Sequence, residues 1–426
     1  MVNTDSATTI PPSTDRGIGR RISPTAAFWV VGLTYLVVMA SSAAPSPLYP
    51  VYQGEWGFSA TTLTVVFAVY AVALLVALLT VGSLSDHVGR KPILISALVL
   101  LVVSLFLFIV ADGVPGLIAA RVVQGLAAGT ATGALSAAVI DLQPSESAGP
   151  LINSVAPSIG LASGALGAGL LVQLAPAPTV LVYALLIGGV VLLAAALMLV
   201  PETSAMRTVE SRRHLAKLLL PRAAFPTGAR VPFLMMVPAL VATWSLGGFH
   251  LSLGPSIIKS LFGIDNHIVG GLEIFALFFS GAVAAACVRT RPPRIVMILG
   301  ALVLAAGVAT SLVSITIASV PLYFLGSVIA GAGWGSTFLG AMRTLGVLVP
   351  ADERGSVFAT TFVISYLAFS VPAVIGGFAV HTFGLQPSAV VYGSFVIVLA
   401  LLSSAGFTAA SRRERPGFSE VTVSGT

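Results

Sequence analysis

Long apolar runs separated by short polar connections repeat along the whole chain. Each run has at least the roughly 20 residues that a helix needs to cross the hydrocarbon core of a bilayer. The pattern therefore predicts an all-α membrane protein with 12 transmembrane helices. We expect these spans at roughly 26–52, 60–82, 92–111, 115–140, 149–174, 178–200, 232–258, 267–288, 293–315, 320–348, 355–382 and 386–410.

Polar segments divide the spans into two sets of six. Both sets carry matching residues at a constant offset: Gly125 and Gly331, Pro144 and Pro350, and Gly149 and Gly355 are each 206 positions apart. A constant offset along the chain indicates an internal duplication, so we expect two pseudo-symmetric six-helix bundles. The expected division is a tail at 1–25, a bundle at 26–200, a linker at 201–231, a bundle at 232–410 and a tail at 411–426.

Composition supports a polytopic membrane protein. The chain is 57% hydrophobic and 8% charged, which excludes an ordinary soluble domain. The net charge of +6 comes from cations in the tails, the linker and the connection at 82–92, so we expect no nucleic-acid partner. Cations favour the cytoplasmic side, which predicts cytoplasmic termini and a multi-pass protein of a bacterial inner membrane. Besides the lipid bilayer, the expected partners are a small-molecule substrate and protons, and we expect a monomer.

Catalysis and cofactors are not indicated. The sequence holds no clustered His, Cys or carboxylate set, so we expect no enzyme activity and no metal. No Gly-x-x-x-x-Gly-Lys-Ser/Thr loop occurs, which disfavours ATP as the driving force, and we expect no cofactor.

The most informative stretch connects the second and third spans. It reads Gly82-x-Leu84-x-Asp86-x-x-Gly89-Arg90-Lys91. Asp86 lies one helical turn after Gly82, and a carboxylate at a helix C-terminus needs an outside partner. We expect a second contact between Arg90 and Asp141.

This stretch resembles the loop between the second and third helices of the major facilitator superfamily of transporters. The resemblance implies that family's fold, with a substrate site between the halves near the midplane. It also implies that Asp86 contacts the start of the eleventh helix, near Gly355 and Ser356, and latches the halves on the cytoplasmic side. In the second half Ala285 occupies the corresponding acidic position, which predicts an asymmetric latch.

Arg121 is a charge inside the fourth span. Leu117-x-x-x-Arg121-x-x-Gln124-Gly125 is similar to the conserved fourth-helix motif of the same family. A guanidinium in hydrocarbon is costly, so Arg121 should face a cavity or a partner. Two interpretations stay open: it satisfies backbone carbonyls, or it takes part in proton coupling by tuning a titrating group nearby.

Glu273 and His250 are the candidates for the titrating group. Glu273 is the only acid well inside a span, and His250 lies in the seventh span. Either could bind the coupling proton. The alternatives are that Glu273 reaches water at the end of its span and that His250 is a hydrogen-bonded packing residue.

The fifth span and the cavity carry weaker signals. Gly160-x-x-x-Gly164-Ala165 partly resembles a fifth-helix motif of antiporters, with Ala165 in place of proline, but close helix packing would also favour these glycines. The family places the cavity on spans one, four, seven and ten. Candidate lining residues are therefore Tyr35, Met39, Arg121, Gln124, Trp244, Phe249, His250, Trp334 and Phe338.

Such a lining suits a bulky, apolar or weakly basic molecule. The expected function is proton-coupled efflux of drug-like or xenobiotic compounds by alternating access. One alternative is a proton-coupled importer of a small metabolite or sugar, and another is a membrane sensor or scaffold that does not transport.

Overall fold

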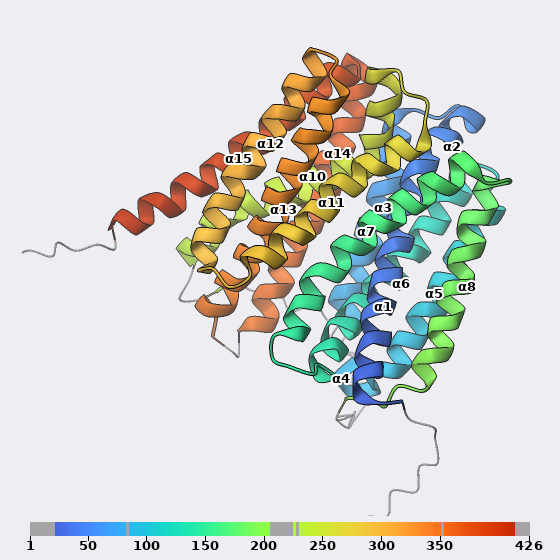
Figure 1. The fold of residues 1–426 in the computed structure, drawn as a ribbon, viewed down its shortest axis with the longest axis vertical. Coiled ribbons are helices and arrows are strands. Elements are labelled where there is room, and N and C mark those ends of the chain that lie inside the picture. Colours follow the sequence, from blue (N-terminus) through green and yellow to red (C-terminus); the bar gives the residue numbers. More distant parts are fainter. Residues whose placement is uncertain (1–21, 82–84, 205–224, 227–229, 351–352, 414–426) are drawn as a thin grey trace, which may run out of the picture.

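The computed structural model describes residues 22–81, 85–204, 225–226, 230–350 and 353–413. These residues contain twelve helices that are long and apolar enough to cross a membrane, so the predicted number of spans is confirmed. The helices run back and forth through two neighbouring bundles (Figure 1).

The first half begins with a span that is broken. It consists of α1 (Pro24–Ala43), a 3-10 turn η1 (Ser46–Leu48) and α2 (Tyr49–Trp56). Pro45, Pro47 and Pro50 follow one another here, and proline removes a helical hydrogen bond and clashes with the preceding turn. The rest of the half is α3 (Ala60–Val81), α4 (Ser85–Val88), α5 (Arg90–Val110), α6 (Val114–Asp141), α7 (Ala148–Leu174) and α8 (Pro178–Met198).

The second half begins with α10 (Arg230–Phe262), the longest of the described helices. This helix continues unbroken through Pro238 and Pro255. A lone proline in a span can be accommodated because neighbouring groups satisfy the freed carbonyl. The remaining helices are α11 (His267–Val288), α12 (Pro293–Thr316), α13 (Val320–Leu348), α14 (Arg354–Phe383) and α15 (Leu385–Arg413).

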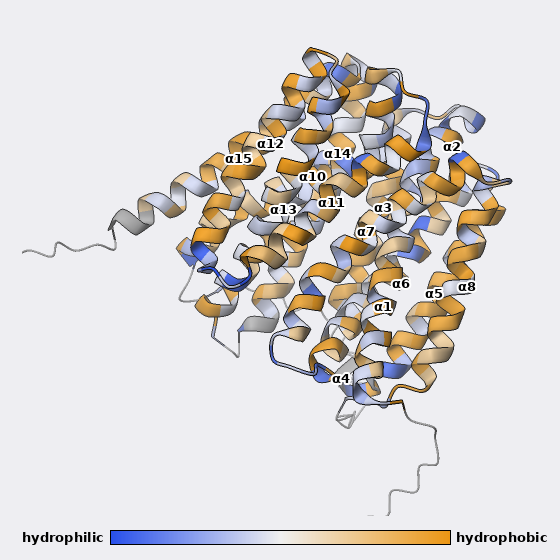
Figure 2. Cartoon of the chain, viewed as in Figure 1, coloured by the Kyte–Doolittle hydropathy of each residue, from blue (hydrophilic) through white to orange (hydrophobic). Residues whose placement is uncertain are grey.

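The two ends of the bundles can be told apart by α4. Ile22, Lys91 and Leu199 lie together at the end that carries α4, which we call the α4 end. The other end, which we call the opposite end, contains residues 47–56, 169–173, 255–267 and 377. Hydrophilic residues gather mainly in the connections at both ends, while apolar residues cover most of the helices (Figure 2).

Among the described residues, the halves touch mainly along two helix pairs. At the opposite end α7 lies against α11, where a methyl group at position 271 would lie 2.6 Å from the Ala165 carbonyl oxygen. In the second pair α3 lies against α14, with the rings of Phe67 and Phe369 centred 4.9 Å apart. The close approach of α7 and α11 is possible because Gly271 has no side chain.

Candidate functional site

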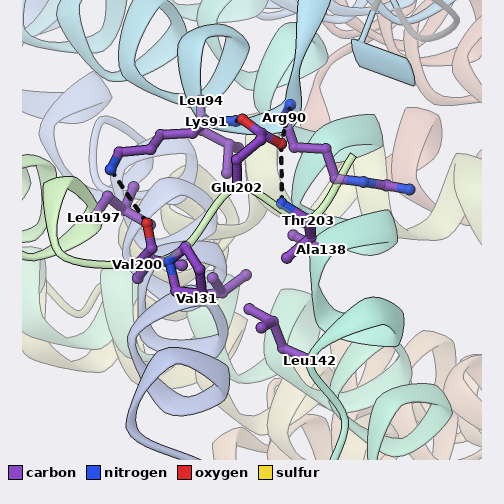
Figure 3. A pocket seen from close by; sticks show the side chains of 11 residues that line it. Val31, Arg90, Lys91, Leu94, Ala138, Leu142, Leu197, Val200, Glu202 and Thr203 are labelled. Carbon is purple, nitrogen blue, oxygen red and sulfur yellow. Dashed lines mark hydrogen bonds between the residues drawn. The ribbon is translucent and has the colours of Figure 1, made fainter. Parts of the chain in front are cut away.

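The connection at the α4 end is held by a residue that the sequence analysis missed. Glu202, just beyond α8, accepts hydrogen bonds from the backbone N–H groups of Arg90 (2.9 Å) and Lys91 (3.0 Å) at the start of α5 (Figure 3). It also accepts from Thr203 and Ser204. Burial by itself raises the pKa of Glu202, but these four backbone donors lower it below the ordinary value.

The residues around Glu202 fit this role. Gly89 has φ 107°, which an L side chain rarely adopts, and a Cβ there would lie 2.9 Å from Glu202 Oε2. Lys91 Nζ donates to the carbonyl oxygens of Met198 and Val200 at the end of α8, the latter at 3.1 Å. A carboxylate therefore caps the N-terminus of α5 and an ammonium caps the C-terminus of α8, each matching the helix dipole.

The contact between Arg90 and Asp141 that the sequence predicts is present. Arg90 Nε lies 2.8 Å from Asp141 Oδ2, and both side chains are partly exposed. This ion pair joins the start of α5 to the end of α6. Gly82, the Asp86 side chain and the surroundings of Gly355 lie outside the described residues, and with them the expected latch.

Arg121 lies in a closed polar cluster within the first half. The side chain is 0% exposed. Its Nε donates to the Tyr49 hydroxyl at 2.9 Å, and Nη1 donates to the Ser42 carbonyl at 3.0 Å and to Gln124 Oε1 at 2.6 Å. Gln124 in turn donates to the Ser41 carbonyl at 2.8 Å. Prolines end α1 after Ala43, and this break frees the carbonyl oxygens that Arg121 and Gln124 use.

Aromatic rings surround the same guanidinium. The rings of Tyr70, Tyr49 and Phe108 have their centroids 5.2, 5.3 and 5.8 Å from the Arg121 Cζ. Within the described contacts, neither Glu273 nor His250 is a partner of Arg121. These contacts favour the interpretation in which Arg121 satisfies carbonyl and hydroxyl groups over the one in which it tunes a titrating group.

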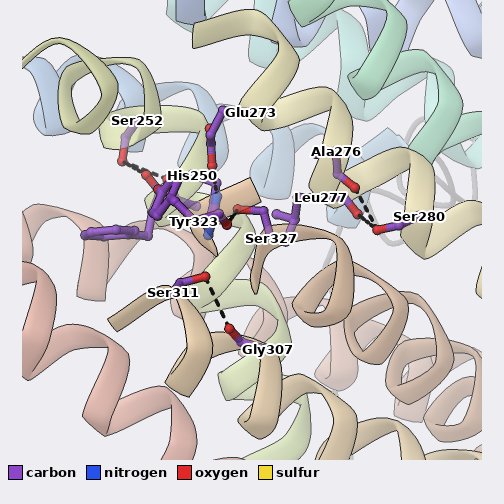
Figure 4. A network of polar contacts seen from close by, with 12 residues as sticks. His250, Ser252, Glu273, Ala276, Leu277, Ser280, Gly307, Ser311, Tyr323 and Ser327 are labelled. Atoms are coloured by element: carbon purple, nitrogen blue, oxygen red, sulfur yellow. Dashed lines mark hydrogen bonds and ion pairs between the residues drawn. The ribbon is translucent and has the colours of Figure 1, made fainter. Parts of the chain in front are cut away.

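Glu273 and His250 form a pair in the second half. Glu273 Oε1 contacts His250 Nδ1, and Figure 4 shows the two side chains pointing toward each other from α11 and α10. The Glu273 side chain is 0% exposed and that of His250 is 6% exposed. Each residue was predicted separately as a candidate proton site, and their contact was not predicted.

The surroundings of this pair are tightly packed and include a tyrosine. Tyr323 of α13 lies beside Glu273. Glu273 Oε2 has no hydrogen-bond donor among the described residues, and this oxygen packs against Gly254, where any side chain would clash. A buried carboxylate with one imidazole partner can hold a proton and exchange it with that imidazole.

The other residues expected to line a cavity lie in three places. Tyr35 accepts a hydrogen bond from Ser136 at 3.3 Å, and Met39 lies on the same helix against Gly160. Phe249 stacks on Tyr392 of α15, with centroids 4.5 Å apart. Trp244, Trp334 and Phe338 form a ring cluster on α10 and α13, with Trp244 and Phe338 centred 5.7 Å apart.

This cluster extends onto α14, which was not among the spans expected to line the cavity. Tyr366 and Phe369 of α14 pack on Trp244 at 4.8 and 5.6 Å. Phe369 also packs against Phe67 of the first half, with ring centroids 4.9 Å apart. The aromatic residues therefore bridge the halves, and an aromatic residue at every third or fourth position of 362–369 was the available signal.

The glycines of α7 serve close packing. Gly160 and Gly164 lie against the α1 backbone at Leu36 and Ala40, while Gly169 lies against His267 of α11. Ala165 occupies the position of the family proline and packs on Gly271. The described residues contain no group of three or more His, Cys, Asp or Glu placed to hold a metal ion.

The arrangement of twelve spans in two bundles, with a basic connection after the second span, is that of a membrane transporter. The sequence matches the Major Facilitator Superfamily over residues 31–371, and the chain belongs to this family. These are secondary transporters and not enzymes.

Particular relatives share less with the chain. The quinolone resistance protein NorA of Staphylococcus aureus is 30% identical over 99 residues, which cover 23% of this chain and 26% of NorA. The chain therefore matches only about a quarter of the length of this curated relative.

Solved structures show the fold. A bacterial homologue of the human lysosomal transporter Spinster, in an inward-facing and unoccupied conformation, has a TM-score of 0.71 at 14% identity and covers 93% of this chain and 99% of its own. A D-xylose–proton symporter has a TM-score of 0.70 at 16% identity, with coverages of 89% and 97%. The predicted fold of two six-helix bundles is thereby confirmed.

Proposed function

We propose that the protein exports drug-like or xenobiotic molecules in exchange for protons, with Glu273 and His250 as the proton site. The observation that carries the proposal is the contact between these two side chains inside the second half. An ionisable pair in hydrocarbon is expensive, and its usual use in a transporter is to bind an ion in transit.

The unequal exposure of the pair suggests the order of transfer. His250 keeps a small exposed area, whereas Glu273 has none. A proton would therefore arrive at the imidazole and pass to the carboxylate through the Nδ1 contact. Tyr323 lies beside the same carboxylate.

An aromatic surface between the halves is the proposed substrate site. Trp244, Tyr366 and Phe369 supply faces on which flat molecules stack. The indole N–H groups of Trp244 and Trp334 have no acceptor among the described residues. A bulky aromatic molecule that carries a hydrogen-bond acceptor suits both features.

The direction of transport and the orientation belong to the same proposal. The partial similarity to NorA, a quinolone resistance protein, favours efflux. Cations at the α4 end favour a cytoplasmic position for that end and for both termini. In this orientation Asp86 and Gly355 would form the cytoplasmic latch, together with the pair of Arg90 and Asp141.

Proteoliposomes with an internal pH dye test the proposal. We expect lipophilic cations and quinolones to evoke proton movement opposite to the substrate, and Glu273→Gln to abolish proton movement while substrate still binds. A matched control is Glu146→Gln, at an exposed acid in the connection between α6 and α7.

Three results would contradict the proposal. Proton movement in the same direction as the substrate would favour the importer, which the Ala165 substitution in the antiporter motif also allows. Unchanged proton coupling in Glu273→Gln would remove the pair from the mechanism. Absence of any transported compound over a broad panel would favour a sensor or scaffold.

A further inference from the structure

Two hydrogen bonds cross between the halves at the opposite end. Gln173 Oε1, at the end of α7, accepts from the backbone N–H of His267 at 3.0 Å. Thr61 Oγ1, at the start of α3, donates to the carbonyl oxygen of Gly377 in α14 at 3.1 Å. Neither residue belongs to a motif that the sequence analysis identified.

The Gln173 bond completes the cap of a helix in the other half. His267 is the first residue of α11, and the N-cap residue Asn266 accepts from Ile268 and Val269 at 2.9 and 3.3 Å. The first N–H groups of a helix have no partner inside the helix and carry partial positive charge. Asn266 does not accept from the N–H of His267, and the first half supplies the acceptor for this group through Gln173.

Glycines bring the two helices close enough for this bond. A methyl group at position 169 would lie 2.5 Å from the His267 carbonyl oxygen, one turn before Gln173. Gly271 lies one turn further along α11 and fits against Ala165. Gly167 on the same helix has open space where a Cβ would stand, so it takes no part in this contact.

The Thr61 bond has a similar setting. A Cβ on Gly377 would clash with Thr64, one turn after Thr61 on α3. Both bonds thus occur where glycine lets a helix of one half approach a helix of the other. They lie on the two helix pairs that join the halves.

We propose that Gln173 and Thr61 form a lock that holds the halves together at the opposite end, with Gln173 as the positioning residue of α11. Separation of the halves at this end breaks both bonds, and water replaces them. This proposal rests on the two hydrogen bonds and the glycines beside them, and it is independent of the identity of the driving ion and the substrate.

Distances between spin labels measure the lock directly. Cysteines replace Glu55 in the first half and Thr382 in the second, both exposed at the opposite end, in a Cys287→Ala background. We expect Gln173→Ala and Thr61→Val each to raise the ratio of separated to closed molecules by roughly 2- to 10-fold in lipid nanodiscs, the range for one lost hydrogen bond. Thr61→Ser should keep the parental ratio.

Charge at position 173 separates a lock from simple packing. Glu faces the positive end of α11, so Gln173→Glu should lower the separated fraction, whereas Gln173→Lys should raise it. Gly169→Ala should raise it and Gly167→Ala should leave it unchanged. Equal shifts for Glu and Lys at position 173, or the parental distribution in all variants, would overturn the proposal.

Discussion

At the scale of residues, the two buried charged clusters differ in the partners that satisfy them. Arg121 makes hydrogen bonds through three of its nitrogens and lies against three aromatic rings. Glu273 contacts one imidazole and leaves its second oxygen without a donor among the described residues. The many partners of Arg121 suit a structural role, and the open oxygen of Glu273 suits the proton site proposed above.

Replacement of Arg121 tests its structural role. Arg121→Lys keeps the charge but loses the planar fork, so the Ser42 carbonyl and Gln124 lose their donor. Each orphaned buried group costs about 1–3 kcal/mol, and we expect a clearly lower melting temperature in detergent. Leu117→Met, a conservative change in the same helix, is the control, and an unchanged melting temperature for Arg121→Lys would contradict this account.

Glu202 provides a prediction with a defined pH dependence. Because its pKa is lowered in the folded protein, the stabilisation is present above the ordinary glutamate pKa of about 4.3 and is lost as pH falls through the folded value. We expect Glu202→Gln to cost about 1 kcal/mol of stability at pH 7, the usual size of a helix cap.

Melting temperatures of the two proteins between pH 7 and pH 3 check this. The difference between wild type and Glu202→Gln should shrink on acidification. A difference that stays constant over this range would show that the carboxylate charge is not what stabilises the connection.

The sequence predicted which buried charged residues are important better than it predicted the side chains and backbone groups that they contact. Arg121, Glu273 and His250 stand out because charge is rare in apolar spans. The contact of His250 with Glu273 depends on how α10 and α11 cross, and that of Glu202 with Lys91 joins residues more than a hundred positions apart. Sequence spacing carries no signal for either contact.

At the scale of elements, glycine and proline decide where helices approach and where they stop. Three prolines in six residues break the first span, which was predicted to be continuous, whereas α10 continues through two prolines that are 17 residues apart. Span limits were predicted to within a few residues because the apolar runs are long. Which glycines touch a neighbouring helix could not be predicted, because α7 has them on several faces.

A matched pair of glycine substitutions on α7 tests this packing. Gly164 lies directly against the Ala40 backbone of α1, whereas Gly167 has open space around it. We expect Gly164→Ala to cost about 1–3 kcal/mol by overpacking and Gly167→Ala to have little effect. Thermal unfolding in detergent measures both, and equal melting temperatures would count against a packing role for Gly164.

At the scale of the whole molecule, the proposed orientation can be tested by chemical labelling. Glu55 lies at the opposite end and Glu146 at the α4 end, and both are exposed. In a Cys287→Ala background, we expect an impermeant maleimide to label Glu55→Cys in intact cells and Glu146→Cys only in inverted vesicles. The reverse pattern would invert the orientation and place both termini outside.

Each charged cluster is built entirely within one half. Arg121 draws its described partners from α1, α2, α3, α5 and α6, and Glu273 draws its own from α10 and α13. If one half rotates against the other, Arg121 and Glu273 therefore keep the partners described above. The described contacts between the halves are made instead by aromatic rings, by glycines and by two hydrogen bonds that water can replace, so the proposed alternation would leave both charged clusters intact.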